Sequence, residues 1–364
     1  MSLNGYERMM VSLRREAPDM VPLWELLIDE PVRRALYGEI SLPDFVEKED
    51  IDGITCSVDQ PMKKISDQVS KDEWGILWRT EPSGLTYPVG GPIRSERDLE
   101  RYGPPDPDSP SLLSTLQECV SRFEGERAVV FMGNEVFEFS HYLVGGMDKL
   151  FLAYYANPAF ALQLADVVGD YFCRLLENAA KAGADVLVTG DDYASRSGPF
   201  MSPEHFKKFI LPYLQRAVDV AKNAGVPFMK HTDGLLWLII DDIVDTGISA
   251  LHPIEPMAGM DIGEVKRRYG DRICVVGNVD CGQLLPRGLQ AEVEEAVKET
   301  IAKASPGGGH ILSSSNSIHP AVKPENYRAM LKAARQFGQY PLDKEMVETY
   351  IKRDYCAKYR FRGP

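Results

Sequence analysis

Several short apolar runs of this chain end abruptly in residues that can move protons or bind metal ions. The run "PFMKHTDG" ends in His231 and Asp233, "DVLVTGDD" ends in Asp191 and Asp192, and "GHILSSSN" ends in Asn316. Imidazole and carboxylate groups act as general acids and bases, and they also bind divalent cations. If these runs are neighbouring strands, their polar ends predict a catalytic site in which Asp191, Asp192 and Asn316 take part.

The spacing of His231 and Asp233 suits a metal ion. Residues two apart on a strand point the same way, so an imidazole and a carboxylate could share one divalent metal. The alternative is structural: Asp233 caps the following helix and His231 is a hydrogen-bonded core group. Both readings stay open from the pattern alone. We expect His252, His310 and His319 to be structural histidines.

Asp191 and Asp192 are adjacent, and adjacent strand residues point to opposite faces. We therefore expect one of them to face a pocket, where it would orient a polar substrate or act as an acid or base. Arg196, in the turn "SRSGP" that follows, could neutralise these aspartates or grip a substrate carboxylate. A solvated loop arginine is an equal alternative.

Other strand ends add further candidates. Glu135 follows "VVFMGN", whose glycine lets the backbone approach a ligand. Tyr142 could donate a hydrogen bond into the site or belong to the core. Glu255, Asp59 and Asn278 also end apolar runs, and we expect them to bind substrate.

The elements that must position these side chains are eight apolar runs, each bounded by turn residues and followed by a helical pattern. Such runs are typical of parallel strands buried on both faces. They span residues 21–27, 52–58, 127–135, 185–192, 226–234, 249–256, 272–280 and 309–316. Eight strands alternating with helices predict an α/β fold, a (β/α)8 TIM barrel, whose active site lies at the carboxyl ends of the strands. A doubly wound open sheet is the alternative.

The long stretch between the second and third runs predicts an insertion. Its segment "DEWGILWRTEPSGLTYPVGGPI" alternates and turns at Pro-Ser-Gly, which is typical of a β-hairpin at the barrel rim between strands 2 and 3. We expect one domain over residues 1–364. Its core spans about 5–340, and a tail over 341–364 packs on the barrel exterior or on a partner subunit.

Composition excludes several classes of function. The formal net charge is −13, so neither nucleic acid nor an anionic membrane is an expected partner. No run of 18 apolar residues occurs in the sequence, and its N-terminal segment lacks the continuous apolar core of a signal peptide, so we expect neither a membrane span nor secretion. The six cysteines form no Cys-x-x-Cys pair, which favours reduced thiols in a cytoplasmic protein.

Longer motifs carry a resemblance to a known family. The segments "DDYASRSGPFMSPEHFKKFILPYLQRAVDVAKNAGVPFMKHTDG", "HPIEPMAGMDIGEVKRRYGDRICVVGNVDCGQLL" and "GHILSSSNSIHPAVKPENYRAM" follow one another in order. Together with "DEWGILW" and "FEFSHYLVGG" they resemble the uroporphyrinogen decarboxylase superfamily over roughly residues 5 to 340. The resemblance implies a (β/α)8 barrel and does not select the reaction.

One branch of this superfamily contains true decarboxylases, which act on a porphyrinogen with eight carboxylates. Their pattern has an Arg-rich "RQAGRY" stretch after the first strand, where this chain has "VPLWELLIDEPVRRALYG". Asp59 and Tyr142 match positions of the decarboxylase pattern. The other strand ends are anionic, however, and like charges repel at close range.

The other branch contains corrinoid- or thiol-dependent methyltransferases, which "PFMKHTDG" and "GHILSSSN" resemble more closely. Its pattern binds zinc through His-x-Cys and a later cysteine. This chain keeps His231 but has Asp233 and Asn316 in place of the thiolates. The resemblance therefore implies a site of nitrogen and oxygen donors. Either zinc or a harder divalent ion binds there, completed by Glu135 or one of the paired aspartates, or the site is metal-free.

The leading functional expectation is transfer of a methyl group from a small O- or N-methyl substrate to a corrinoid. No Asp-x-His-x-x-Gly corrinoid signature occurs, so a partner protein would carry the corrinoid. The first alternative is decarboxylation of a porphyrinogen-type substrate such as uroporphyrinogen. The second is a barrel that binds a small ligand without turnover. The resemblance also implies a homodimer.

Overall fold

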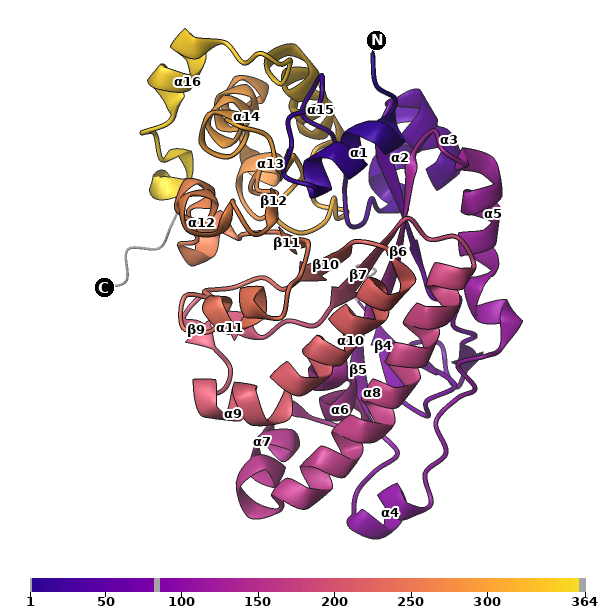
Figure 1. Cartoon of the computed structure of the whole chain (residues 1–364). Coiled ribbons are helices and arrows are strands. Elements are labelled where there is room, and N and C mark those ends of the chain that lie inside the picture. Colours follow the sequence, from indigo (N-terminus) through magenta and orange to yellow (C-terminus); the bar gives the residue numbers. More distant parts are fainter. Residues whose placement is uncertain (1, 82–85, 360–364) are drawn as a thin grey trace.

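The computed structural model of the protein describes residues 2–81 and 86–359, and a parallel sheet lies at its centre (Figure 1). Within these residues the sheet has seven strands in the order β1-β6-β7-β10-β11-β12-β13, and every pairing is parallel. The strands are β1 (Gly53–Ser57), β6 (Ala128–Asn134), β7 (Val186–Gly190), β10 (Phe228–His231), β11 (Ala250–His252), β12 (Cys274–Val276) and β13 (His310–Ile311). The order follows the chain in one direction, without the reversal that defines a doubly wound sheet.

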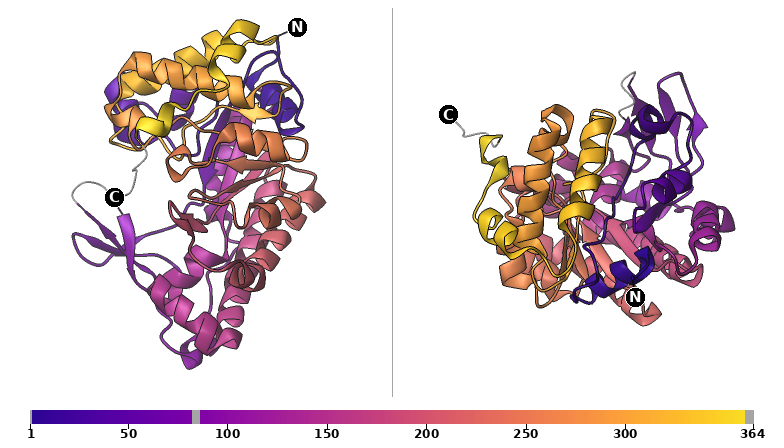
Figure 2. Two further views of the ribbon diagram at one scale, coloured as in Figure 1. Left: turned by 90° about the vertical axis from the view of Figure 1, so that its left-hand side faces the viewer. Right: turned by 90° about the horizontal axis from the view of Figure 1, so that it is seen from above.

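Helices connect successive strands and lie around the sheet (Figure 2). They are α1 (Gly5–Leu13), α2 (Glu30–Tyr37), α3 (Leu42–Lys48), α4 (Glu96–Glu100), α5 (Ser114–Phe123), α6 (Val136–Val144), α7 (Met147–Ala156), α8 (Pro158–Lys181), α9 (Pro203–Phe209), α10 (Leu211–Ala224), α11 (Ile240–Asp245), α12 (Ile262–Tyr269), α13 (Leu284–Arg287), α14 (Gln290–Ala304), α15 (Pro324–Phe337) and α16 (Lys344–Tyr350). Among the described helices, none combines the length and the apolar character needed to cross a membrane.

The longest helix, α8, illustrates why these segments fold as they do. The Asn157 side chain accepts a hydrogen bond from the backbone of Phe160, and Pro158 occupies the first turn, so the helix start is well capped. Its apolar positions recur every three or four residues and bury Leu164, Val168 and Leu175 against the sheet.

The segment that precedes β1 has contacts next to both edge strands of the sheet, β1 and β13. Leu23 forms a parallel bridge with Leu312, Ile28 forms one with Ile318, and the Leu23 carbonyl accepts a hydrogen bond from Asp52 at 2.9 Å. The first expected strand, 21–27, is therefore extended and joined by single bridges rather than by a regular ladder. The sheet is curled into a half-barrel, which is consistent with a TIM-like barrel.

The inside of the curled sheet is packed with apolar side chains. Val130, Val188, Met229 and Val276 are buried there, and Met9 of α1 packs onto them. A packed interior is what a barrel of this type requires, because its strands surround a core and not a pore. The polar residues that follow the strands are therefore left at their carboxyl ends.

Between β1 and β6 the chain forms a four-stranded antiparallel sheet, where the sequence predicts a single hairpin. Its strands are β2 (Lys63–Lys64), β3 (Val69–Lys71), β4 (Leu77–Thr80) and β5 (Thr86–Gly90). The Pro-Ser-Gly turn of the expected hairpin falls on residues 82–85, which lie outside the described residues. Gly91 follows β5 and runs so close to α6 that a Cβ there would meet the Leu143 carbonyl oxygen at 2.1 Å.

The tail packs on the outside of the fold, against α14. Its helix α16 is followed by the short 3-10 helix η3 (Tyr355–Lys358). Arg353 pairs with Glu295 at 2.7 Å, and the Tyr355 backbone donates to Glu299 at 2.7 Å. The sequence predicts that the tail packs either on the exterior of its own barrel or on a partner subunit, and in this structure it packs on the exterior of its own chain.

Candidate active site

Two histidines meet at the carboxyl end of the sheet, because β10 ends at His231 and β11 ends at His252. Their Nδ1 atoms lie 2.8 Å apart, and the Nε2 atom of His252 lies 3.0 Å from the Ser313 hydroxyl. Burial lowers the pKa of both imidazoles, and that of His252 falls well below its ordinary value. Both rings are therefore neutral at pH 7, and His231 belongs to a hydrogen-bonded pair.

Asp192 faces this histidine pair. Its Oδ1 atom lies 3.7 Å from His231 Nε2 and accepts a hydrogen bond from the Asp233 backbone at 3.1 Å. The Asp192 side chain is about one-third exposed, at 34%. It therefore presents a carboxylate to both solvent and the imidazole.

Asp191 has a different environment, as the alternation of a strand predicts. Its two oxygens accept hydrogen bonds from the backbones of Phe137 at 2.8 Å and Glu138 at 2.7 Å. These are free N–H groups of the first turn of α6, so Asp191 caps that helix. Burial raises the pKa of this carboxyl well above its ordinary value. The structure thus places the predicted catalytic Asp191 as a helix cap with both oxygens engaged.

Asp233 and Asn316 lie together although 83 residues separate them. The Asn316 Nδ2 atom donates to Asp233 Oδ2 at 2.8 Å. Burial and the nearby charges of Asp192 and Glu255 raise the pKa of Asp233 to about 7, while the Asn316 hydrogen bond opposes this rise. A carboxyl group with this pKa can give or accept a proton near neutral pH.

Arg196 pairs with Glu255 rather than with the aspartates of the preceding strand. The Arg196 Nε atom lies 3.0 Å from Glu255 Oε1, and Glu255 Oε2 accepts a hydrogen bond from the Gly234 backbone at 3.0 Å. Of the alternatives open for Arg196, neutralisation of Asp191 and Asp192 is therefore not what the structure shows. Its guanidinium remains half exposed.

Arg196, Asp233, Glu255 and Asn316 line a pocket of about 340 Å³ at the carboxyl end of the sheet, within the size range of small-molecule sites, whereas Asp192 and His231 are not in its lining. Its polar lining includes Asp29, Asp233, Glu255, Asp280, Arg196, Asn316 and His319. We call the group of Asp192, His231, Asp233, Glu255 and Asn316 the mouth. Four carboxyl groups and one guanidinium line the pocket, so its charge is predominantly negative.

Glu135 does not reach the mouth but forms a buried ion pair. Its Oε1 atom lies 3.0 Å from the Nζ atom of Lys230, and both side chains are almost fully buried. The hydroxyls of Thr189 and Tyr193 also donate to Glu135. Sequence reasoning missed Lys230, although a lysine inside an apolar strand is a signal, because such a buried charge requires a partner.

Helix α6 adds a carboxylate that sequence reasoning also missed. Burial and the charge of Asp192 raise the pKa of Glu138 to about 7, and the Tyr142 hydroxyl hydrogen-bonds Glu138. The Tyr142 ring contacts that of Trp78 in β4, with centroids 5.3 Å apart. The signal was weak, because the start of α6 right after Glu135 was not predicted.

Glu25 ends the extended segment before β1 and is buried beside the end of β13. Both carboxyl oxygens accept hydrogen bonds from the Ser314 backbone at 3.1 Å, and one accepts from the Ser314 hydroxyl at 2.6 Å. Burial nevertheless raises the pKa of Glu25 to about 8. This group is therefore protonated in the folded protein at neutral pH.

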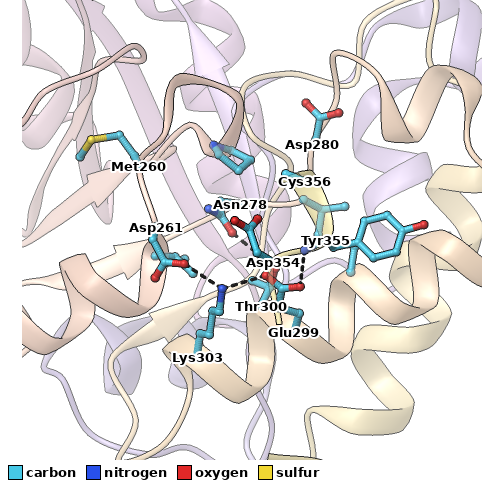
Figure 3. A pocket seen from close by; sticks show the side chains of 14 residues that line it. Met260, Asp261, Asn278, Asp280, Glu299, Thr300, Lys303, Asp354, Tyr355 and Cys356 are labelled. Carbon is cyan, nitrogen blue, oxygen red and sulfur yellow. Dashed lines mark hydrogen bonds and ion pairs between the residues drawn. The ribbon is translucent and has the colours of Figure 1, made fainter. Parts of the chain in front are cut away.

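Two expected substrate-binding residues are engaged elsewhere. Asp59 accepts hydrogen bonds from the backbone and hydroxyl of Thr115, at the start of α5. Asn278 donates to the Ile254 carbonyl at 2.8 Å and lies by Thr300 in a cavity of about 30 Å³ beneath the tail (Figure 3). The structure thus shows structural hydrogen bonds for both.

The donors present do not form a ready metal site. Across residues 2–81 and 86–359, no three His, Cys, Asp or Glu side chains are grouped to hold an ion. Asp233 accepts a hydrogen bond from Asn316. The two candidates to complete the metal coordination are also engaged, Glu135 with Lys230 and Asp191 with the backbone of α6. In this arrangement the predicted ligands His231 and Asp233 do not fit a preformed metal centre.

Comparison with known proteins agrees with this architecture. Residues 82–337 match the family described as "Uroporphyrinogen decarboxylase (URO-D)". The uroporphyrinogen decarboxylases of Actinobacillus pleuropneumoniae (serotype 5b, strain L20) and Aeromonas salmonicida (strain A449) are 25% and 26% identical to this chain. These alignments cover 92% and 91% of this chain and 97% of each relative.

Among solved structures, a methyltransferase from Methanosarcina mazei has a similar fold, with a TM-score of 0.69 at 19% identity. The match covers 92% of this chain and 99% of that one. The family match extends over most of the chain and confirms the resemblance predicted from its motifs. The protein therefore belongs to the uroporphyrinogen decarboxylase (URO-D) family.

Proposed function

We propose that this protein transfers a methyl group from a small O- or N-methyl compound to a corrinoid carried by a partner protein. The observation that carries the proposal is the negative charge of the pocket, which four carboxyl groups and a single guanidinium line. Arg196, that guanidinium, is already paired with Glu255. A small neutral or cationic methyl compound suits such a site, whereas a substrate with many carboxylates is repelled by it.

Two neighbouring carboxyl groups, Asp233 of the mouth and Glu138 of α6, have a property that methyl transfer requires. When a methyl group leaves an ether oxygen or a neutral amine nitrogen, the electron pair of the broken bond stays on that atom, which then needs a proton. A cationic nitrogen leaves as the neutral amine and needs none. Asp233 and Glu138 have pKa values raised to about 7, so each can supply a proton at neutral pH. A corrinoid in its reduced form would accept the methyl group and supply the electron pair of the new bond. The fold shared with the Methanosarcina mazei methyltransferase supports the same proposal.

Decarboxylation of a uroporphyrinogen-type substrate is the second candidate. The observation that favours it is the name of the curated relatives, which are uroporphyrinogen decarboxylases aligned over more than 90% of this chain. Against it stands the scarcity of cations in the pocket, since Arg196 alone would face a substrate with eight carboxylates.

One pair of assays separates the candidates. The protein is incubated with reduced free cobalamin and a panel of methoxy compounds and methylated amines, and methylcobalamin is followed by its absorbance. In parallel, uroporphyrinogen is supplied and its products are resolved by chromatography. We expect methylcobalamin with at least one donor, and at least a tenfold lower rate for Asp233→Asn. Loss of carboxyl groups from uroporphyrinogen, without methylcobalamin, would overturn the proposal. Binding of a donor without turnover would favour a non-catalytic barrel.

A further inference from the structure

A chain of hydrogen bonds runs from the backbone of Ser314 to the mouth. The Ser313 hydroxyl lies 2.8 Å from the Ser314 carbonyl oxygen, which can only accept, so the hydroxyl donates its one proton there. The same hydroxyl lies 3.0 Å from the Nε2 atom of His252. Since its proton is already used, the Ser313 oxygen accepts from His252, and His252 carries its proton on Nε2.

The protonation of His252 then determines that of His231. A neutral imidazole has one N–H donor and one acceptor nitrogen, so the Nδ1 atom of His252 accepts. The only nitrogen of His231 within reach of it is Nδ1, at 2.8 Å. His231 must therefore donate from Nδ1. Full burial of His252 disfavours a second proton on that ring, which keeps this direction fixed.

We infer that His252 and Ser313 are positioning residues that commit the proton of His231 to Nδ1, so that Nε2 faces the mouth as an acceptor. This Nε2 atom lies 3.7 Å from Asp192 Oδ1. A lone pair and a carboxylate oxygen at this separation form two acceptors side by side. The ligand that satisfies both carries two hydrogen-bond donors, such as the N–H groups of a primary or secondary ammonium.

The inference deepens the proposed function, because it assigns the orientation of the imidazole at the same site, yet it can be tested without turnover. Neutral histidine tautomers give distinct ¹⁵N shifts for their two ring nitrogens. Protein labelled with ¹⁵N-histidine is measured by long-range ¹H–¹⁵N correlation, without ligand or corrinoid. The His231 and His252 signals are assigned by their loss in His231→Asn and His252→Asn.

We expect His231 protonated on Nδ1 and His252 on Nε2 in the wild type. In Ser313→Ala His252 loses one of its two acceptors and keeps the Ser314 backbone, so at least a tenth of His231 should shift to the Nε2-protonated form. Ser315→Ala is the matched control. It removes a buried hydroxyl of the same segment, bonded to Cys281 and not to either imidazole, and should leave the tautomers unchanged.

A proton on His231 Nε2 in the wild type would overturn the inference, and so would an unchanged tautomer in a folded Ser313→Ala protein. Should that variant fail to fold, the wild-type spectrum alone decides. Absence of methyl transfer combined with the expected tautomers would defeat only the proposed function. The reverse combination would defeat only this inference.

Discussion

The amide of Asn316 donates to the carboxylate of Asp233 at 2.8 Å, and this bond joins the segments that follow β10 and β13. The hydrogen bond favours the charged form of Asp233, whereas burial and the charge of Asp192 favour the neutral form. The proton affinity of Asp233 is thus set by neighbours that are far apart in the sequence.

Two substitutions should move the pKa of Asp233 in opposite directions. Asn316→Ala removes a hydrogen bond to the charged form and should raise this pKa further above about 7. Asp192→Asn removes a neighbouring negative charge and should lower it. The measurement is a pH titration of the Asp233 carboxyl carbon by ¹³C NMR. Shifts of the same sign in both variants would contradict this arrangement.

Restoring thiolates should create a zinc site. Asp233 and Asn316 occupy the positions where the family pattern has cysteines, and their side chains touch. The double variant Asp233→Cys with Asn316→Cys should therefore bind zinc with His231 at least a hundredfold more tightly than the wild type, because thiolates are strong zinc ligands. Competition with a chromophoric chelator measures the affinity.

The control for this zinc site is the double variant with His231→Ala, which should lose most of the gain. Equal zinc affinity in the double variant and the wild type would show that the two positions do not converge on an ion. The zinc content of the untreated wild type, measured by mass spectrometry, tests the predicted native metal site at His231 and Asp233.

Breaking the buried pair of Lys230 and Glu135 should destabilise the protein severely. Lys230→Met leaves a buried carboxylate without its cation, and such changes lower the free energy of unfolding by about 3–5 kcal/mol. Adding Glu135→Gln removes the unpaired carboxylate and should restore part of the lost free energy of unfolding. Urea unfolding measures both.

A surface pair provides the matched control for this experiment. Arg272 and Asp245 lie 2.8 Å apart with side chains 45% and 66% exposed. Arg272→Ala should lower the free energy of unfolding by no more than about 1 kcal/mol. A similar loss for Lys230→Met and Arg272→Ala would contradict the burial of the first pair.

Glu25 should make the folded state less stable as pH rises. Its folded pKa of about 8 exceeds its ordinary value of 4.5, so the folded protein holds this proton while the unfolded chain releases it. The contribution of Glu25 to stability therefore falls between pH 4.5 and 8. Glutamine does not titrate. The free energy of unfolding of Glu25→Gln, relative to that of the wild type, should therefore increase by about 3 kcal/mol from pH 5 to pH 8. A constant difference in urea unfolding at both pH values would contradict the assignment.

The carboxyl ends of the strands could be predicted from the sequence, because a strand buried on both faces is a short apolar run and its end is marked by the first polar residues. Asp233, Glu255, Arg196 and Asn316 line one pocket, as their positions suggested. The partners of these side chains were harder to predict. Arg196 pairs with Glu255 and not with Asp191 or Asp192, which are nearer in the sequence. The conformation of the loop, and not the sequence separation, determines which carboxylate the guanidinium contacts.

Residues whose role depends on burial were missed or misplaced. Lys230 and Glu135 pair inside the protein, and nothing in either local pattern shows that β10 and the start of α6 bring them within 3.0 Å. Asp59 and Asn278 do end apolar runs, but their hydrogen bonds go to Thr115 and Ile254. A polar residue after a strand is thus an equally good helix cap or loop anchor, and only the packed fold decides between these roles.

The antiparallel sheet of β2 to β5 meets α6 through the contact of Trp78 with Tyr142, and the Tyr142 hydroxyl bonds Glu138. This insertion is separate from the ladder of the central sheet. The insertion can therefore change in length or shape without altering the register of the central sheet. Two aromatic contacts, Trp78 with Tyr142 and Trp74 with Phe139, therefore connect the shape of this insertion to the helix that carries Glu138.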